Sequence, residues 1–134
     1  MRYVAFVHDD DEPGFGVSFP DFPGCISDGD TVDDALRRGA EALSFHVGGM
    51  MADGESIPEP RSLHDIKADD SLAGWRDGAT IAFVPLILDN GSPRRINVSL
   101  DSALLHAIDD EAKRRGMTRS AFLTSAARNE IEGR

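Results

Sequence analysis

Three polar side chains alternate along a short stretch near the C-terminus, and their types suit the reading of DNA bases. Arg95, Asn97 and Ser99 share one face of an expected strand, because successive side chains of a strand point to opposite faces. Arginine suits the O6 and N7 atoms of guanine, asparagine suits the N6 and N7 atoms of adenine, and serine donates or accepts. A two-stranded ribbon fits the major groove. These three residues are therefore the predicted base-reading set.

The opposite face of the same strand is apolar and needs a cover. Two amphipathic helices follow it: the first begins near Asp101 and stops at Gly116, and the second is capped by Thr118. A unit of about forty residues usually needs a metal, disulfides or oligomerisation to be stable. The chain has no second cysteine, and the segment has no metal-ligand set, so we expect a homodimer in which the strand pairs with its copy. The apolar residues of the strand are Ile96, Val98 and Leu100.

The start of the second helix is the predicted phosphate contact. Thr118, Arg119 and Ser120 would offer free backbone N–H groups and one cation at a helix N-terminus. Such contacts position a protein on DNA without reading its sequence.

The charge is divided unevenly along the chain. The whole protein has a net charge of −10, but residues 1–90 carry 18 acidic against 6 basic residues, a net of −12. Residues 91–134 carry 8 basic against 6 acidic residues, a net of +2. An acidic body attracts basic surfaces and repels phosphate, so only the tail has a charge suited to DNA. A turn at 89–93 divides the two predicted domains, 1–90 and 91–134.

Composition places the protein among ordinary soluble domains. Hydrophobic residues make up 40 % of its 134 residues, and no apolar run is long enough to span a bilayer. No signal-peptide pattern follows the strand-like start, and the single cysteine, Cys25, argues for a reducing compartment. We therefore expect a cytoplasmic protein without a membrane partner.

The first ninety residues predict a β-β-β-α-β unit, so the fold class is α+β. Residues 2–7 are apolar on both faces and should form the central strand. A helix should begin at Thr31 and stop at Gly54. Residues 55–78 read as a long surface connection, in which Trp75 is expected to anchor the loop on the sheet, with a partner contact as the alternative. The remaining strands are expected at 15–19, 25–27 and 80–88.

The tail resembles the ribbon-helix-helix DNA-binding domain. The resemblance lies in Arg95-Ile96-Asn97-Val98-Ser99-Leu100, Leu104-Leu105, Ile108-Asp109, Ala112 and Gly116-Met117-Thr118-Arg119-Ser120-Ala121-Phe122-Leu123.

The body is similar to the HicB family of type II antitoxins. The shared motifs are Phe19-Pro20-Asp21-Phe22-Pro23-Gly24-Cys25, Gly29-Asp30-Thr31 with Asp33-Asp34-Ala35, Glu41-Ala42-Leu43 and Ile57-Pro58-Glu59-Pro60. The resemblance implies a partial RNase H-like body that binds and blocks a HicA-type RNA-cleaving toxin. It also implies a tail that represses the shared operon by binding operator DNA. It assigns no toxin-contacting residues, and it leaves open whether dimers pair further into tetramers.

Other functions fit the sequence less well. An EF-hand loop starting at Asp9 would place Pro20 where a bidentate Glu is required. A nuclease would need carboxylates converging on two metal ions, and the first strand supplies none. Cys25 has no histidine beside it in the sequence. We therefore predict no catalytic residue, no metal and no cofactor. The main alternative is a stand-alone ribbon-helix-helix regulator whose N-terminal domain senses a ligand or another protein.

Overall fold

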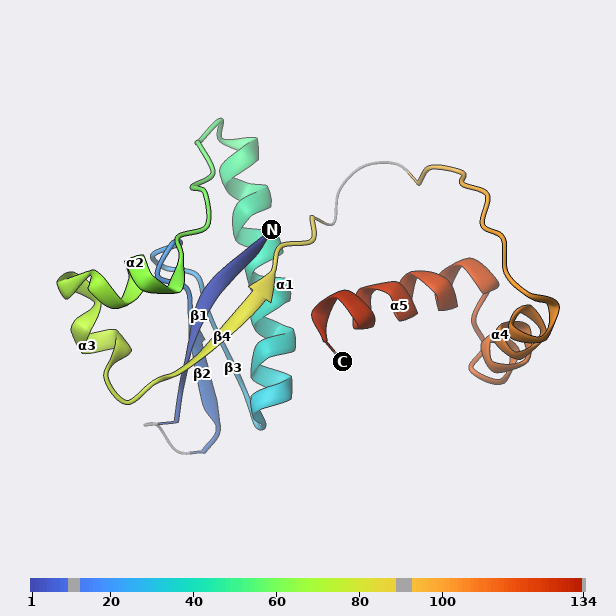
Figure 1. The fold of residues 1–134 in the computed structure, drawn as a ribbon, viewed down its shortest axis with the longest axis horizontal. Coiled ribbons are helices and arrows are strands. Elements are labelled where there is room, and N and C mark those ends of the chain that lie inside the picture. Colours follow the sequence, from blue (N-terminus) through green and yellow to red (C-terminus); the bar gives the residue numbers. More distant parts are fainter. Residues whose placement is uncertain (10–12, 89–92, 134) are drawn as a thin grey trace. The chain divides into compact units, whose positions relative to one another are not determined.

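The computed structural model describes residues 1–9, 13–88 and 93–133. The chain divides into two compact units, Met1–Asn90 and Gly91–Arg134, each of which has its own internal packing. The first contains a sheet with helices, and the second contains two helices (Figure 1).

The first unit is built around a four-stranded antiparallel sheet. Its strands are β1 (Arg2–His8), β2 (Phe15–Ser18), β3 (Ile26–Gly29) and β4 (Thr80–Pro85), in the order β3-β2-β1-β4. Strand β1 pairs with β2 on one side and β4 on the other. Five successive residues of β1, from Tyr3 to Val7, are buried, so the expected central strand is confirmed.

One long helix covers one face of this sheet. Helix α1 (Val32–Ala52) begins as expected at Thr31, whose hydroxyl oxygen accepts a hydrogen bond from the Asp34 N–H at 3.1 Å. It ends beside Gly54, whose φ of +74° is a conformation that glycine adopts without strain. Leu43 and Val47 of α1 are buried against the side chains of β1 and β2 that face this helix.

The other face of the sheet has a cover that the sequence interpretation missed. The expected surface connection at 55–78 contains α2 (Leu63–Ala68), the 3₁₀ helix η1 (Asp70–Leu72) and α3 (Ala73–Arg76) (Figure 1). Each of these helices is too short to show a helical period in the sequence. Ile66 of α2 is fully buried in a second cluster with two β1 residues, Val4 and Phe6.

An ion-pair cluster fastens this connection to the loop after β2. The Arg61 guanidinium lies 2.6 Å from the Asp21 carboxylate and 2.9 Å from that of Asp69, and it also donates to the Pro20 carbonyl. The Asp21 side chain is only 2 % exposed. Nearby, the Tyr3 hydroxyl donates to the Pro58 carbonyl at 2.7 Å. These contacts place the short helices on the sheet.

The second unit consists of α4 (Ser102–Arg114) and α5 (Arg119–Glu132), preceded by an extended segment. The expected strand over 95–100 is absent: residues 93–100 adopt no helix or strand in the single chain. A strand is defined by its hydrogen-bonded neighbour, and one copy of the chain supplies none to this segment. Among the described residues, no helix is long and apolar enough to cross a membrane.

The ion-pair cluster predicts a specific loss of stability. The Arg61→Ala variant should lose roughly 2–3 kcal/mol of unfolding free energy, because it leaves the buried Asp21 carboxylate with only a backbone donor. Urea denaturation of the full chain measures this loss. Arg38→Ala is the matched control, since its 3.8 Å pair with Asp28 is exposed and should contribute less than about 1 kcal/mol. Equal losses in the two variants would contradict the structural role of Arg61.

Candidate functional site

The predicted base-reading residues lie on the extended segment that precedes α4. Arg95, Asn97 and Ser99 are all exposed. The alternating apolar residues are uncovered as well: Ile96 is 75 % exposed and Val98 is 60 % exposed. A single copy of the chain therefore leaves both faces of this segment in solvent. Several apolar side chains in solvent along one face are unfavourable, and burial against another surface would be favourable.

The helices that follow this segment are defined by local capping bonds. The Asp101 carboxylate accepts from the Leu104 N–H at 2.8 Å and begins α4. Gly116, with a φ of +67°, allows the chain to turn into α5. Ile108 and Ala112 of α4 are buried. Two further apolar residues, Leu104 and Ile131, remain about half exposed. The helix pair therefore has apolar surface that the described residues of a single chain do not cover.

The predicted phosphate contacts lie at the first turn of α5. The Thr118 hydroxyl accepts from the Ala121 N–H at 3.1 Å, as expected for the cap residue. The N–H groups of Arg119 and Ser120 belong to this first turn, where backbone donors have no partner within their helix. An anion at this position would therefore meet oriented N–H groups and the positive end of the helix dipole.

The cation of this predicted site is already paired. Arg119 donates from Nε and Nη2 to the two carboxylate oxygens of Asp109, each at 2.8 Å. Asp109 lies ten residues earlier on α4, and no local spacing rule in the sequence indicates this pair. The Arg119 guanidinium holds the pKa of the Asp109 carboxyl below its usual value. A phosphate that binds Arg119 must compete with this carboxylate.

A second carboxylate pairs with two guanidinium groups at the end of α4. Glu111 accepts hydrogen bonds from both Arg114 and Arg115, the latter at 2.9 Å. These two guanidinium groups lower the pKa of Glu111 to about 2. Arg115 also lies over the Phe122 ring, 5.5 Å from its centroid. The basic residues that end α4 are thus held in place by neighbours in the same unit.

The described part of the acidic unit contains no cluster of side chains that could bind a catalytic metal ion. No group of three His, Cys, Asp or Glu side chains there could hold a metal ion. Part of the acidic run considered in the sequence, residues 10–12, lies outside the described residues. Cys25 is buried, and this burial raises the pKa of its thiol to about 11, which disfavours the reactive thiolate.

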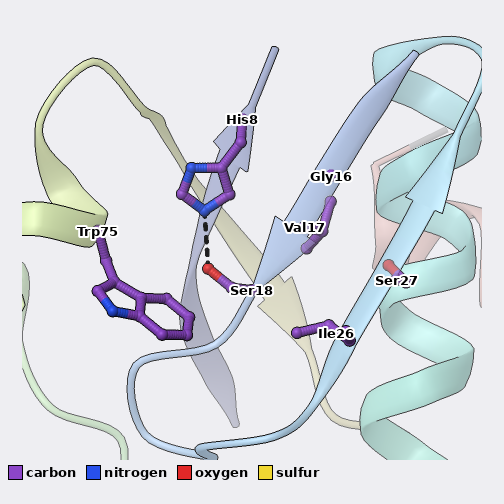
Figure 2. Close-up of a pocket in the computed structure, with 7 residues that line it drawn as sticks. All are labelled: His8, Gly16, Val17, Ser18, Ile26, Ser27 and Trp75. Carbon is purple, nitrogen blue, oxygen red and sulfur yellow. Dashed lines mark hydrogen bonds between the residues drawn. The ribbon is translucent and has the colours of Figure 1, made fainter. Parts of the chain in front are cut away.

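The sheet face opposite α1 contains a hollow that the sequence interpretation did not identify. The His8 Nε2 atom and the Ser18 Oγ atom are hydrogen-bonded at 2.9 Å beside it, with the Trp75 indole nearby (Figure 2). The hollow has a volume of about 260 Å³. Trp75 is 55 % exposed, so the buried anchor of the connection is Ile66 and not the expected Trp75. The lining residues are His8, Gly16, Val17, Ser18, Ile26, Ser27 and Trp75.

Comparison with known families and proteins gives a consistent result. A family model described as a HicB-like antitoxin of a bacterial toxin-antitoxin system matches residues 3–127. An uncharacterised 14.9 kDa protein of Haemophilus phage HP1 is 33 % identical over 120 residues, which are 88 % of this chain and 89 % of that protein. Antitoxin HicB 1 of Photorhabdus laumondii is 38 % identical over 60 residues, 45 % of this chain, and the match spans only 39 % of its length.

Solved structures agree with these sequence matches. The crystal structure of the Burkholderia pseudomallei antitoxin HicB covers 95 % of this chain and 96 % of its own, with 36 % identity and a TM-score of 0.57. A chain of the HicA3 and HicB3 toxin-antitoxin complex covers 65 % of this chain and 99 % of its own, with 30 % identity and a TM-score of 0.53.

The pairing of Glu111 predicts an unusual titration. Its carboxyl group should lose its proton near pH 2 in the folded chain, because two guanidinium groups favour the charged form. The stabilisation from this lowered pKa is therefore present above about pH 4.5 and is lost as the pH falls towards 2. Carbon-detected NMR of the carboxyl groups measures the midpoint. Replacing Arg114 and Arg115 by Gln should return it towards 4.5, and a wild-type midpoint already near 4.5 would contradict the pairing.

Proposed function

The chain belongs to the HicB-like family of bacterial antitoxins, and from this premise we propose that its two units have separate roles. The acidic unit, 1–90, binds and blocks a HicA-like RNA-cleaving toxin without catalysing a reaction. The C-terminal unit, 91–134, dimerises as a ribbon-helix-helix domain and represses the operon that encodes both proteins. The observation that carries this proposal is the family match over residues 3–127.

Charge supports the toxin-binding role. A protein that binds RNA needs a basic surface, and a unit with a net charge of −12 attracts such a surface and speeds association. A relative occurs in a complex of HicA3 and HicB3. Inhibition then follows from simple occlusion, because a bound acidic unit covers the toxin's RNA-binding surface. The order of three strands, the long helix α1, three short helices and then β4 is compatible with the partial RNase H-like character that the family resemblance implies.

The exposed segment before α4 supports the DNA-binding role. Residues 95–100 would pair with the same segment of a second copy. This pairing would give the backbone N–H and C=O groups of both segments hydrogen-bond partners and direct Ile96 and Val98 towards the helices. The opposite face would then present two copies of Arg95, Asn97 and Ser99 to the major groove. The first turn of α5, at Thr118–Ser120, would contact the flanking phosphates.

Co-expression tests the antitoxin role directly. The chain should co-purify with a basic protein of roughly 60–90 residues encoded beside it, and native mass spectrometry of the complex should give its stoichiometry. The co-expressed cells should survive induction of that protein, whereas cells that express it alone should not. Failure of the two proteins to associate would contradict the antitoxin role and favour the stand-alone regulator.

Asn97→Ala tests the base-reading set. Removing the amide should lower affinity for the operator by about tenfold or more, because a bidentate contact to a base contributes roughly 1–3 kcal/mol of discrimination. Fluorescence anisotropy with operator and scrambled duplexes measures this loss, while the oligomeric state and toxin inhibition should be unchanged.

Arg119→Ala is the matched control for this experiment. It removes a predicted phosphate contact and should weaken binding to both duplexes equally, lowering the salt dependence by about one unit of slope per copy of the chain. If Asn97→Ala binds the operator within twofold of the wild type, the segment does not read DNA.

A further inference from the structure

The short helices cover only half of the sheet face on which they lie. Ile66, Leu72 and Ile81 pack with Val4 and Phe6, which belong to the β1 side of this face. Ser18 of β2 is still buried, at 3 % exposure, but Ile26, its neighbour on β3, is 67 % exposed. The outer β2–β3 part of this face is thus less covered by the described residues than the β1 side, and the hollow lies beside Trp75 of α3 at this place (Figure 2).

Strand register explains why the surface is hollow. In one cross-strand row Phe6 lies opposite Ser18, and Ser18 lies opposite Ile26. In the next row His8 lies opposite Gly16, and Gly16 lies opposite Asp28. Directly paired residues of an antiparallel sheet point to the same face. The two β2 positions are therefore a glycine and a serine, small residues between larger neighbours on β1 and β3.

The groups around the hollow suit a basic side chain. The exposed Trp75 ring can receive a guanidinium or ammonium group on its face. The Ser18 hydroxyl and the His8 ring supply hydrogen-bonding atoms. Asp28, in the same row as Gly16, has a side chain 87 % exposed, and its contact with Arg38 is long, at 3.8 Å. This carboxylate can therefore exchange Arg38 for a cation from another protein.

We propose that the hollow between β2, β3 and α3 is the docking site for the toxin, and that it takes an arginine or lysine side chain from the toxin's basic surface. This inference rests on the proposed antitoxin function and assigns its contact residues. The occupant is a basic protein, because the unit that bears the hollow has a net charge of −12 and Asp28 lies on the same face. Trp75 would be the central contact, since tryptophan is enriched among the residues that dominate interface energies.

Gly16 allows the hollow to be filled without disturbing the fold. A Cβ atom added at Gly16 would lie 4.0 Å from its nearest neighbours, the His8 Cβ and the Ser27 carbonyl oxygen, which is ordinary contact. A branched side chain at this strand position is compatible with β-structure. The Gly16→Val variant should therefore keep the stability of the wild type while occupying the floor of the hollow.

The experiment measures binding of the full chain to the basic HicA-like protein encoded beside it, by isothermal titration calorimetry. Gly16→Val should weaken this binding at least about tenfold, and Trp75→Ala about thirtyfold, the loss that defines a dominant interface residue. Phe45→Ala is the matched control: Phe45 is an aromatic residue 85 % exposed on α1, which packs on the opposite sheet face, so binding should stay within about twofold.

A second readout uses the only tryptophan of the chain. In chain labelled with ¹⁵N, the indole N–H resonance of Trp75 should shift when the unlabelled toxin is added. Binding that is unaffected by both Gly16→Val and Trp75→Ala, or that is lost in Phe45→Ala instead, would overturn the docking site and leave the antitoxin role intact. Absence of any binding by the wild-type chain would overturn both. If Gly16→Val is less stable than the wild type, Trp75→Ala and the indole shift decide.

Discussion

The need of a strand for hydrogen-bonded neighbours is the constraint on which this structure depends. In the first unit β1 has a neighbour on each side and a helical layer on each face, so it forms the core. In the second unit residues 95–100 alternate between polar and apolar side chains, but they have no hydrogen-bonded neighbour among the described residues, and they remain exposed and irregular. One physical rule therefore makes the first unit complete in a single chain and the second incomplete. Our proposal of DNA binding rests on that difference, with a second copy of the segment as the proposed neighbour.

Local signals in the sequence predicted much of this fold. Thr31, Asp101 and Thr118 each cap a helix as expected, because capping depends on residues only three positions apart. The contacts that were not predicted join distant residues: Asp21 with Arg61, forty positions apart, and Ile66 with the β1 residues Val4 and Phe6. The hollow could not be predicted either, since it depends on the register that places Gly16 between His8 and Asp28. The base-reading and phosphate residues were placed by sequence pattern, and their roles remain proposals.

Electrostatics separates the two units further. The excess of carboxylates in residues 1–90 suits a basic partner, whereas three cations of the second unit are paired with carboxylates: Arg119 with Asp109, and Arg114 and Arg115 with Glu111. A cation that is paired with a carboxylate binds phosphate only by giving up that carboxylate. This exchange lowers the net binding free energy that each phosphate contact contributes. Pairing of these three cations would thereby reduce non-specific attraction to nucleic acid, and in the proposed DNA-binding role a larger share of operator affinity would come from the base-reading set. In the proposed docking site, an incoming cation would likewise replace Arg38 in its long and exposed pair with Asp28.

The central claim is that a second copy of the chain completes the segment before α4, and hydrogen exchange of that segment tests it most directly. Amide exchange of residues 95–100 should be measured by mass spectrometry on the isolated full chain over a range of concentrations. The account predicts slow exchange where the chain has twice its 14.5 kDa mass, with protection lost on dilution to the monomer. Fast exchange of these amides at every concentration, in a chain that stays monomeric, would contradict it.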